Sequence, residues 1–391
     1  MADLQARVQK ILDDATSSDG LVGCSFAAVD RSGKVLVSVG SGYEELGNKD
    51  RPAKPDSLYC LYSCTKAIAT IAVMQLVEQG KISLDDHVGD KVPQVAQAAF
   101  ADGRKPKTPI TLRHLLTHTA GFGYTFFDDG LKKWSEETGH DEFDGTLEGI
   151  TSPLIAEPGE DWNYGVNIDW AGQYLEKVTG MTLGEYCKKN IFDPLGADDI
   201  AFGLLPTNKD RLVKMHQRGP DGKFTVRDHL TFTHKASYDA GGAGCIGTVE
   251  SYLKCVTILL NGGVGANGAR ILKAETVEQM LQDQLGDVRT KSGIDPMERP
   301  IPAATPELTL PVEMAPGVKK GWGLSFQILK DDLPHGRKSG AVWWAGLCNN
   351  YWQVDPKSGV ATMILSQSFP FNDPRAIGAW VTAEVEVYKS L

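Results

Sequence analysis

Runs of β-forming residues lie near both ends of this chain, and the stretch between them shows little strand signal. Near the start, the runs 21–30 and 34–43 flank RSG, which is typical of a hairpin. Near the end, the segments 321–329, 341–355 and 359–368 are again β-rich, and a helical pattern closes the chain. This arrangement predicts one antiparallel sheet that is built from both chain ends and covered by helices.

The middle of the chain is predicted to be rich in helices and loops, with helical patterns in ITLRHLLTHTAGF, NIDWAGQYLEKVTG and TLGEYCKKNIF. With 391 residues, the chain is long enough for two domains. We therefore predict an α/β (α+β) fold in which residues 1–85 and 235–391 form a sheet domain and residues 86–234 form an inserted, mostly helical domain. A long Pro-rich loop, 285–318, is expected at the rim of a site.

Composition argues against several classes of function. The net charge is −10, which disfavours nucleic acids and anionic membranes as partners. The start of the chain carries charges at Asp3, Arg7, Lys10 and Asp13, which predict an amphipathic helix rather than an export signal. No apolar run approaches the roughly 18 residues that span a bilayer. Seven cysteines without a C-x-x-C pair indicate reduced thiols, so we expect a cytoplasmic protein of undetermined oligomeric state.

A serine and a lysine lie three residues apart in SCTK, at the head of a long apolar helical pattern. Residues three apart share a helix face, so Ser63 and Lys66 are expected side by side on a core helix. In a structural interpretation, Ser63 caps the helix and Lys66 extends to solvent. In a catalytic interpretation, burial lowers the proton affinity of Lys66, which then activates Ser63 as a nucleophile. A second S-x-x-K, SYLK at 251–254, has the pattern of an ordinary polar pair.

Two further segments carry groups that such a serine would need. Tyr164 in PGEDWNYGVNIDWAG could pass a proton between a lysine and a leaving group, provided that nearby positive charge lowers its pKa; the alternative is a core tyrosine. Ala345 and Gly346 are small residues in an otherwise bulky strand, which indicates a close approach to the backbone at an oxyanion hole, or else a β-bulge. The N–H groups of Leu347 and Ser63 would form that hole.

Two other patterns favour a structural interpretation. His114 and His118 lie four residues apart, a spacing that can bind a metal ion on one helix face, but no acidic third ligand is near, so structural hydrogen bonding is favoured. GVGANG, 263–268, matches G-x-G-x-x-G but lies between helical patterns instead of after a strand, so a turn is favoured over a dinucleotide site. We expect neither a metal ion nor an organic cofactor.

The order of these motifs resembles the serine β-lactamase and penicillin-binding protein superfamily. SCTK is followed by TLRHLLTHTAG, PGEDWNYG, DAGGAGCIGT and WWAG, and the resemblance covers essentially the whole chain. It implies a β-lactamase-like fold with an α/β domain made from both termini, a helical domain, and an active site between them. Position by position, it implies that Ser63 is the nucleophile, that Lys66 and Tyr164 are base and proton relay, and that Leu347 contributes to the oxyanion hole.

Within this superfamily, the third motif separates the branches. β-Lactamases and peptidases carry K-T-G where this chain has Trp344-Ala345-Gly346. That sequence resembles the W-x-G of the class C-like esterases, or family VIII carboxylesterases, and more closely the fungal transesterases exemplified by the lovastatin acyltransferase. The tyrosine motif of class C enzymes, Y-x-N, is not kept, because Asn167 comes one residue late. The missing K-T-G lysine removes the cation that would hold a β-lactam carboxylate.

The resemblance and the residues together predict serine-dependent acyl transfer on carboxylic esters. The donor would be a small-molecule ester or thioester and the acceptor water or an alcohol. Substrate contacts are expected from Trp344, Gly346, Tyr124, Trp162 and Trp322, and with Phe122, Phe126 and Phe127 the aromatic residues favour an apolar acyl group, although a core shows the same clustering. The alternatives are a β-lactamase or D-alanyl peptidase, and a non-catalytic binding protein of the same fold.

Overall fold

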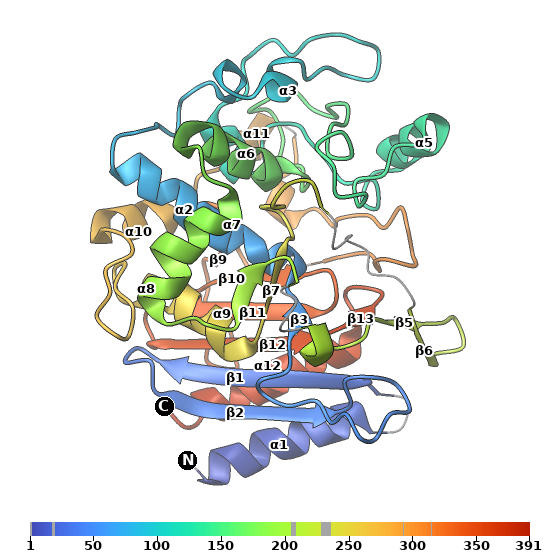
Figure 1. Ribbon diagram of the computed structural model, residues 1–391, viewed down its shortest axis with the longest axis vertical. Helices are drawn as coiled ribbons and strands as arrows, with labels where there is room; N and C mark the ends of the chain where they lie inside the picture. Colours follow the sequence, from blue (N-terminus) through green and yellow to red (C-terminus); the bar gives the residue numbers. More distant parts are fainter. Residues whose placement is uncertain (1, 18–19, 205–208, 228–235, 292, 314) are drawn as a thin grey trace.

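A seven-stranded antiparallel sheet joins the two ends of the chain in the computed structural model, which describes residues 2–17, 20–204, 209–227, 236–291, 293–313 and 315–391. Its strand order is β2-β1-β12-β11-β10-β9-β8 (Figure 1). The strands are β1 (Gly23–Asp30), β2 (Val35–Gly42), β8 (Lys320–Trp322), β9 (Gln327–Leu329), β10 (Val342–Gly346), β11 (Asn350–Asp355) and β12 (Val360–Ser366). The predicted sheet from both termini is therefore confirmed.

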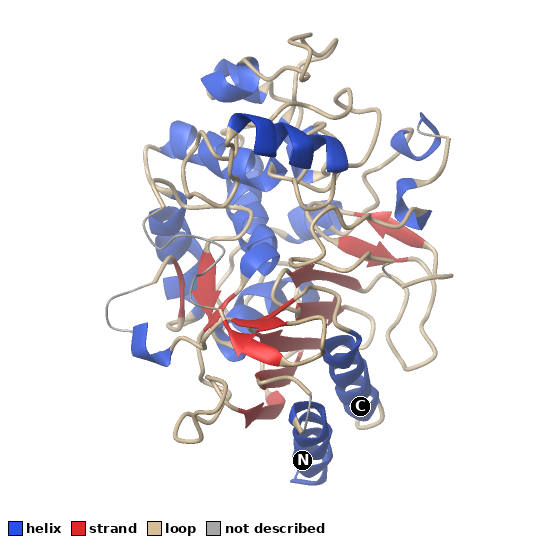
Figure 2. Cartoon of the chain, turned by 90° about the vertical axis from the view of Figure 1, so that its right-hand side faces the viewer, coloured by secondary structure: helices blue, strands red, loops and turns tan. Residues whose placement is uncertain are grey.

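The first strand of the chain pairs with the strand that comes last in this sheet along the chain. β1 pairs with β12 in antiparallel register, from Cys24 opposite Ser366 to Asp30 opposite Val360. The terminal helices α1 (Ala2–Thr16) and α12 (Pro374–Tyr388) pack against each other below the sheet (Figure 2). The two ends of the chain are thus held together by a sheet ladder and by a helix pair.

Helices cover both faces of the sheet because side chains alternate along each strand. Tyr351 of β11 stacks on Trp380 of α12, whereas its neighbour Trp352 packs against Tyr252 of α9 (Val249–Val256) on the opposite face. Each face of the sheet therefore buries aromatic side chains under a helix, and buried residues line all of β10, β11 and β12.

Helix α2 (Thr65–Glu78) is the central helix of the molecule. Its residues from Thr65 to Leu76 are all buried, because apolar or small side chains point in every direction around it. It contacts α6 (Asn167–Thr179) and α7 (Leu183–Cys187) on the helical side and α9 on the sheet side. The helix begins two residues later than Ser63, since Tyr62–Cys64 form a 3₁₀ turn that leads into it.

The other helices of the described residues are short and lie mostly in the upper part of the molecule in Figure 1. They are α3 (Pro93–Ala96), α4 (Leu112–Leu116), α5 (Asp129–Thr138), α8 (Asp193–Leu195), α10 (Ala274–Met280) and α11 (Val288–Lys291). Two small sheets lie beside them, β3-β7-β4 and β13-β5-β6. Their strands are β3 (Tyr59–Cys60), β4 (Ile200–Phe202), β5 (His216–Arg218), β6 (Phe224–Val226), β7 (Cys245–Gly247) and β13 (Ser368–Phe369).

The described part of 86–234 consists of helices and longer loops and also contains β4, β5 and β6, which the sequence pattern does not reveal because each spans three residues. One hydrophobic cluster extends from the terminal helices through α2 to the helices above it. The domain division at 85/86 stays a prediction, and the boundary at 234/235 lies outside the described residues. The segment GVGANG forms a turn closed by a bridge between Val264 and Arg270, which confirms its structural interpretation.

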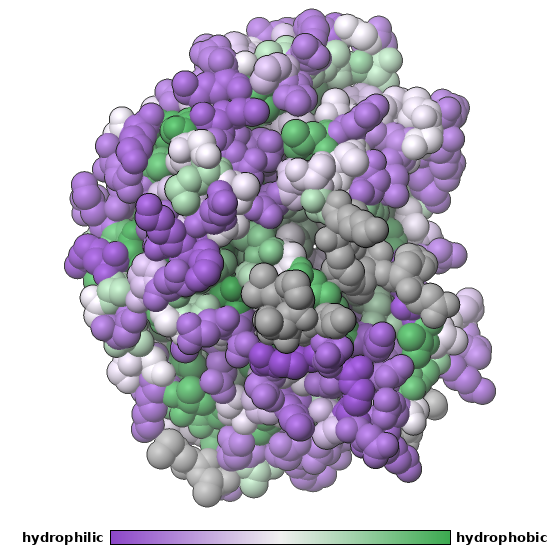
Figure 3. Space-filling model, in the orientation of Figure 1, coloured by the Kyte–Doolittle hydropathy of each residue, from purple (hydrophilic) through white to green (hydrophobic). Residues whose placement is uncertain are grey.

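The molecular surface is mainly hydrophilic on the face shown in Figure 3, and hydrophobic residues show chiefly in hollows between polar ones. Within the described ranges, none of the helices combines the length and the hydropathy that crossing a bilayer requires.

Because α2 is buried all round, truncating one of its side chains should leave a cavity in the centre of the protein. Ile71→Ala is expected to lower the free energy of unfolding by about 2–5 kcal/mol in urea titrations. The matched control is Ile294→Ala, since Ile294 is 61% exposed, and this change should stay within about 0.5 kcal/mol of the parent. Equal effects of the two substitutions would contradict the central position of α2.

Candidate active site

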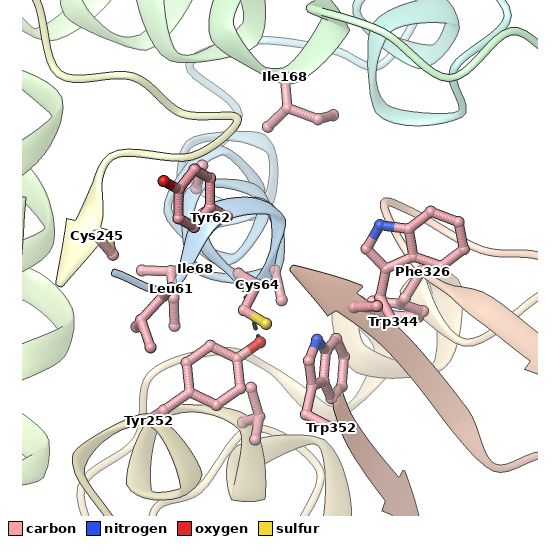
Figure 4. Packing of buried hydrophobic residues seen from close by; sticks show 14 of the residues in the cluster. Leu61, Tyr62, Cys64, Ile68, Ile168, Cys245, Tyr252, Phe326, Trp344 and Trp352 are labelled. Atoms are coloured by element: carbon pink, nitrogen blue, oxygen red, sulfur yellow. Dashed lines mark hydrogen bonds between the residues drawn. The ribbon is translucent and has the colours of Figure 1, made fainter. Parts of the chain in front are cut away.

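The Ser63 side chain lies at a sharp turn between β3 and α2. Tyr62 has a φ of 47°, in the left-handed region that non-glycine residues seldom adopt. The turn is held from the sheet side, where the Tyr252 hydroxyl donates to the Cys64 carbonyl at 2.9 Å and Trp344 and Trp352 face the turn (Figure 4). Strain of this kind persists only where the surroundings determine the backbone, and here it presents a half-buried Ser63 to a pocket.

Lys66 is completely buried one helical turn after Ser63. Its Nζ donates to Ser63 Oγ at 3.1 Å, to the Tyr124 hydroxyl at 3.0 Å and to the Gly242 carbonyl at 2.9 Å. Burial lowers the Lys66 pKa to about 7, against the opposing effect of Asp169. Lys66 does not extend to solvent, and Ser63 does not cap α2, whose N-cap is Cys64, so the structural interpretation of SCTK is wrong.

The second S-x-x-K differs from the first in every respect that matters for nucleophile activation. Ser251 Oγ accepts a hydrogen bond from the Asp199 N–H, and Lys254 is exposed and donates to the Gly196 carbonyl. Lys254 therefore keeps its contact with solvent, whereas Lys66 is completely buried. The same four-residue pattern therefore places its lysine at the surface in one helix and in the interior, beside Ser63, in the other.

Tyr164 reaches the Ser–Lys pair from the loop that precedes α6. Its hydroxyl is hydrogen-bonded to Ser63 and accepts from the Trp344 indole N–H at 2.8 Å, and Lys66 Nζ lies 4.7 Å from its ring centroid. Burial raises the pKa of Tyr164 despite these hydrogen bonds. The condition of a lowered pKa is therefore not met, because desolvation outweighs the hydrogen bonds from Ser63 and Trp344, and Tyr164 stays a neutral phenol that can both give and accept a proton.

The end of β10 touches the turn that carries Ser63. A Cβ atom on Gly346 would lie 2.3 Å from the Leu61 carbonyl oxygen, so only glycine fits there. The close approach predicted from Ala345 and Gly346 is confirmed, and the β10–β11 register runs from Val342 to Gly346 without the shift that a β-bulge would cause. Leu347 follows directly and lines the same pocket as Ser63.

An apolar pocket of about 500 Å³, counted with its open mouth, lies beside Ser63. Predicted residues Tyr124, Trp344, Gly346 and Leu347 line it. The sequence also predicts substrate contacts for Trp162 and Trp322, but neither lines this pocket. Trp322 is fully buried and meets Trp344 edge-on at 4.5 Å, and Trp162 packs on Tyr164 and Trp322, so both support the site from behind.

Several residues of the pocket wall come from segments that local patterns do not connect with the site. Phe143 stacks on Phe126, and Ile301 and Val312 come from the Pro-rich loop, whose predicted place at the rim is thereby confirmed. The remaining described lining residues are Tyr62, Phe127, Tyr164, Ala243, Ala345 and Phe371. Every described lining residue is uncharged, so the pocket suits an apolar group.

Asp169 and Gly242 complete the surroundings of Lys66, and sequence reasoning assigned no role to either. Asp169 Oδ1 accepts the Gly242 N–H at 3.0 Å, and the Gly242 carbonyl accepts from Lys66. A Cβ on Gly242 would lie 2.3 Å from Asp169 Oδ2, which explains a glycine at this place in DAGGAG. The glycine-rich run DAGGAG is a signal that the sequence offers for Gly242. Its partner, Asp169 on α6, can be identified only from the tertiary structure.

The two histidines have structural roles. The Thr111 N–H donates to His114 Nδ1 in a capping box at the start of α4, which confirms structural hydrogen bonding. The helix ends at Leu116, so His118 does not share a helix face with His114 as predicted; instead its Nδ1 lies 2.9 Å from the Asn167 amide nitrogen. Asn167 thus faces His118 rather than Lys66. Over the described residues, no group of three or more His, Cys, Asp or Glu side chains is placed to hold a metal ion.

A family model described as Beta-lactamase matches residues 8–386 of this chain. The chain belongs to the β-lactamase family. The resemblance seen in the motifs and the predicted fold are both confirmed by this match and by the sheet topology. The motif WWAG, which the resemblance in the sequence sets against K-T-G, forms the end of β10.

Curated relatives of the chain are acyltransferases and esterases. The ML-236A carboxylate methylbutanoyltransferase of Penicillium citrinum is 32% identical over 340 residues, which make up 83% of this chain and 78% of that protein. The lovastatin esterase of Penicillium rubens is 31% identical over 365 residues, or 89% of this chain and 88% of the relative. A mutant simvastatin synthase of Aspergillus terreus superposes with a TM-score of 0.84 at 29% identity, covering 100% of this chain and 95% of that one. This β-lactamase-family chain therefore belongs with the serine acyl-transfer enzymes.

The charge of Asp169 should set the pH at which Lys66 becomes a base. Activity should rise with pH through about 7, because the neutral amine forms as pH passes the Lys66 pKa. Asp169→Asn removes the charge that raises this pKa, so the acid limb of the rate of ester cleavage should move to lower pH. Asp239→Asn is the control. Asp239 is the first residue of the same glycine-rich run, and its carboxylate accepts a hydrogen bond from the Gly184 N–H. A profile unchanged in Asp169→Asn would contradict the assignment.

Proposed function

We propose that this protein transfers acyl groups from small-molecule esters or thioesters to water or an alcohol through an acyl-Ser63 intermediate. The observation that carries the proposal is the buried Lys66 amine, 3.1 Å from Ser63 Oγ, with a pKa lowered to about 7. An amine of this kind is a base near neutral pH. Its serine faces an apolar pocket, and the relatives of the chain are acyltransferases and esterases.

Acylation begins with proton transfer from Ser63 to the neutral Lys66. Ser63 Oγ attacks the ester carbonyl carbon, and the N–H groups of Ser63 and Leu347 donate to the oxygen that becomes negative. When the tetrahedral adduct collapses, the bond to the leaving alcohol breaks and the alkoxide takes a proton through the Tyr164 hydroxyl, which Lys66 resupplies. The Trp344 indole holds that hydroxyl in place at 2.8 Å.

Deacylation uses the same groups in the reverse order. Water or an alcohol gives its proton through Tyr164 to Lys66 and attacks the acyl carbon, and Ser63 Oγ leaves with the proton returned by Lys66. Hydrolysis and transesterification therefore share one machinery and differ only in the acceptor. No step requires a metal ion or an organic cofactor.

The pocket distinguishes this activity from the two alternatives. Each described lining residue is uncharged, and Trp344 uses its indole N–H on Tyr164, so nothing there replaces a lysine that would bind a β-lactam carboxylate. A non-catalytic binding protein would gain nothing from a desolvated lysine beside a serine, because burying an amine costs free energy. Both alternatives remain outcomes of the first experiment.

Incubation with p-nitrophenyl esters of several chain lengths should give turnover and, in intact-mass spectra, an acyl adduct that Ser63→Ala abolishes. Ser251→Ala is the matched control, because it alters the serine of the second S-x-x-K, and both turnover and adduct should persist. Added alcohols should yield transfer products in competition with hydrolysis. An inert protein without an adduct would overturn the enzyme assignment, and rapid cleavage of nitrocefin with inert esters would favour the β-lactamase.

Phe143 should limit the length of the acyl group, since it stacks on Phe126 with ring centroids 5.7 Å apart in the pocket wall. Phe143→Ala is expected to raise kcat/KM for long acyl chains relative to short ones, because the pocket gains depth. Phe100→Ala, a half-buried phenylalanine away from the pocket, should leave the ratio unchanged. A chain-length preference that does not move in Phe143→Ala would show that the acyl group binds elsewhere.

A further inference from the structure

The turn between β10 and β11 carries Leu347, one of the two proposed oxyanion donors. Gly346 pairs with Asn350 across the hairpin, so Leu347, Cys348 and Asn349 form its three-residue loop. Asn349 has a φ of 61°, and asparagine is among the few residues that adopt this conformation readily. Its amide donates to the carbonyls of Ser368 and Pro370, which ties the loop to the segment that follows β12.

The next residue, Asn350, connects this hairpin to the turn of the nucleophile. Asn350 is completely buried, and its side-chain amide donates to the Cys60 carbonyl at 2.9 Å. Its Oδ1 accepts the Ser366 N–H at 2.9 Å, so the side chain itself cannot rotate without losing a sheet hydrogen bond. One asparagine thus joins β11, β12 and the residue three positions before Ser63.

The Cys60–Leu61 peptide is held from both sides. The Cys60 carbonyl accepts hydrogen bonds from the side-chain amides of Asn350 and, at 3.1 Å, of Gln367. The Leu61 N–H donates to the Cys245 carbonyl at 2.9 Å. This peptide leads directly into Tyr62, whose φ of 47° needs outside support. The carbonyl of Leu61 in turn limits how closely Gly346 can approach.

The two proposed oxyanion donors lie on separate parts of the chain, Ser63 in the 3₁₀ turn before α2 and Leu347 directly after β10. Their separation depends on the contact between the β10–β11 hairpin and the 60–62 segment. The Asn350 amide donates one side-chain hydrogen bond from the hairpin to that segment, and Gln367 adds another from beyond β12. The side chains of Cys348 and Tyr62 are also hydrogen-bonded to each other. A displacement of about 1 Å between catalytic groups can lower a rate about 100-fold.

Building on the function proposed above, we propose that Asn350 is a positioning residue of the oxyanion hole: its amide fixes the Ser63 turn against the hairpin that carries Leu347. Asn350 touches neither substrate nor the reacting atoms. It acts through the Cys60 carbonyl, and its effect should appear where charge develops on the carbonyl oxygen and not in ground-state binding of the ester.

Asn350→Asp tests the proposal with almost no change of shape. The substitution keeps an oxygen for the Ser366 N–H but replaces the NH₂ group that donates to Cys60. The rate of Ser63 acylation should fall about 10- to 100-fold with little change in KM for the ester. The ratio of the acylation rate of an oxo ester to that of its thiono ester should also fall. The thiono sulfur accepts hydrogen bonds only weakly, so its acylation rate depends less on the position of the oxyanion donors.

Gln353→Leu is the matched control for damage to the strand. Gln353 is buried on β11 but on the opposite face from Asn350, opposite Trp343 in the register, so acylation and the oxo-to-thiono ratio should not change. If Asn350→Asp does not fold, as judged by circular dichroism, Gln367→Met carries the test. It removes the second amide on the Cys60 carbonyl and should change the rate and the ratio in the same direction.

A folded Asn350→Asp or Gln367→Met with the parental acylation rate and ratio would overturn the role of this contact while leaving the proposed function intact. Acylation that persists in Ser63→Ala would instead overturn the proposed function itself. The two failures are therefore distinguishable in one set of proteins.

Discussion

The burial of Lys66 beside Ser63 is the constraint on which the rest of the site depends. A lysine can lie inside an apolar helix bundle only if its amine has acceptors and can lose its proton at modest cost. Ser63, Tyr124 and the Gly242 carbonyl provide those acceptors, and desolvation lowers the pKa to about 7. The condition that makes the lysine tolerable in the core is thus the same condition that makes it a base.

The site around Lys66 is assembled from segments that only the fold brings together. The groups that complete the site come from the loop before α6, from the glycine-rich run near 242 and from β10, which are far apart in sequence. The sheet ladder between β1 and β12 places the carboxyl-terminal strands beside the turn of Ser63, and buried side-chain amides fasten them to it. Catalytic geometry here is a property of the contact between sheet and helix.

Trp344 connects β10 to the surroundings of Ser63. A lysine at this strand position would present a cation to a carboxylate, whereas the tryptophan gives its N–H to Tyr164 and its ring to an uncharged pocket. Trp162 and Trp322 pack behind it and fix its orientation. The same strand therefore holds the Tyr164 hydroxyl and lines the uncharged pocket beside Ser63.

The sequence alone determined the sheet from both termini, and it marked Ser63, Lys66 and Gly346 as candidate positions, because each stands out in a local pattern of apolar, small or turn-forming residues. The tertiary structure decided which of two S-x-x-K pairs is buried deeply enough to react, and it raised the pKa of Tyr164 instead of lowering it. It also decided that Asp169, Gly242 and Phe143 surround the site while Trp322 stands behind it. These features depend on contacts between segments that are distant in sequence. The order of residues along the chain does not show how far a side chain is removed from water or which distant side chains lie beside it.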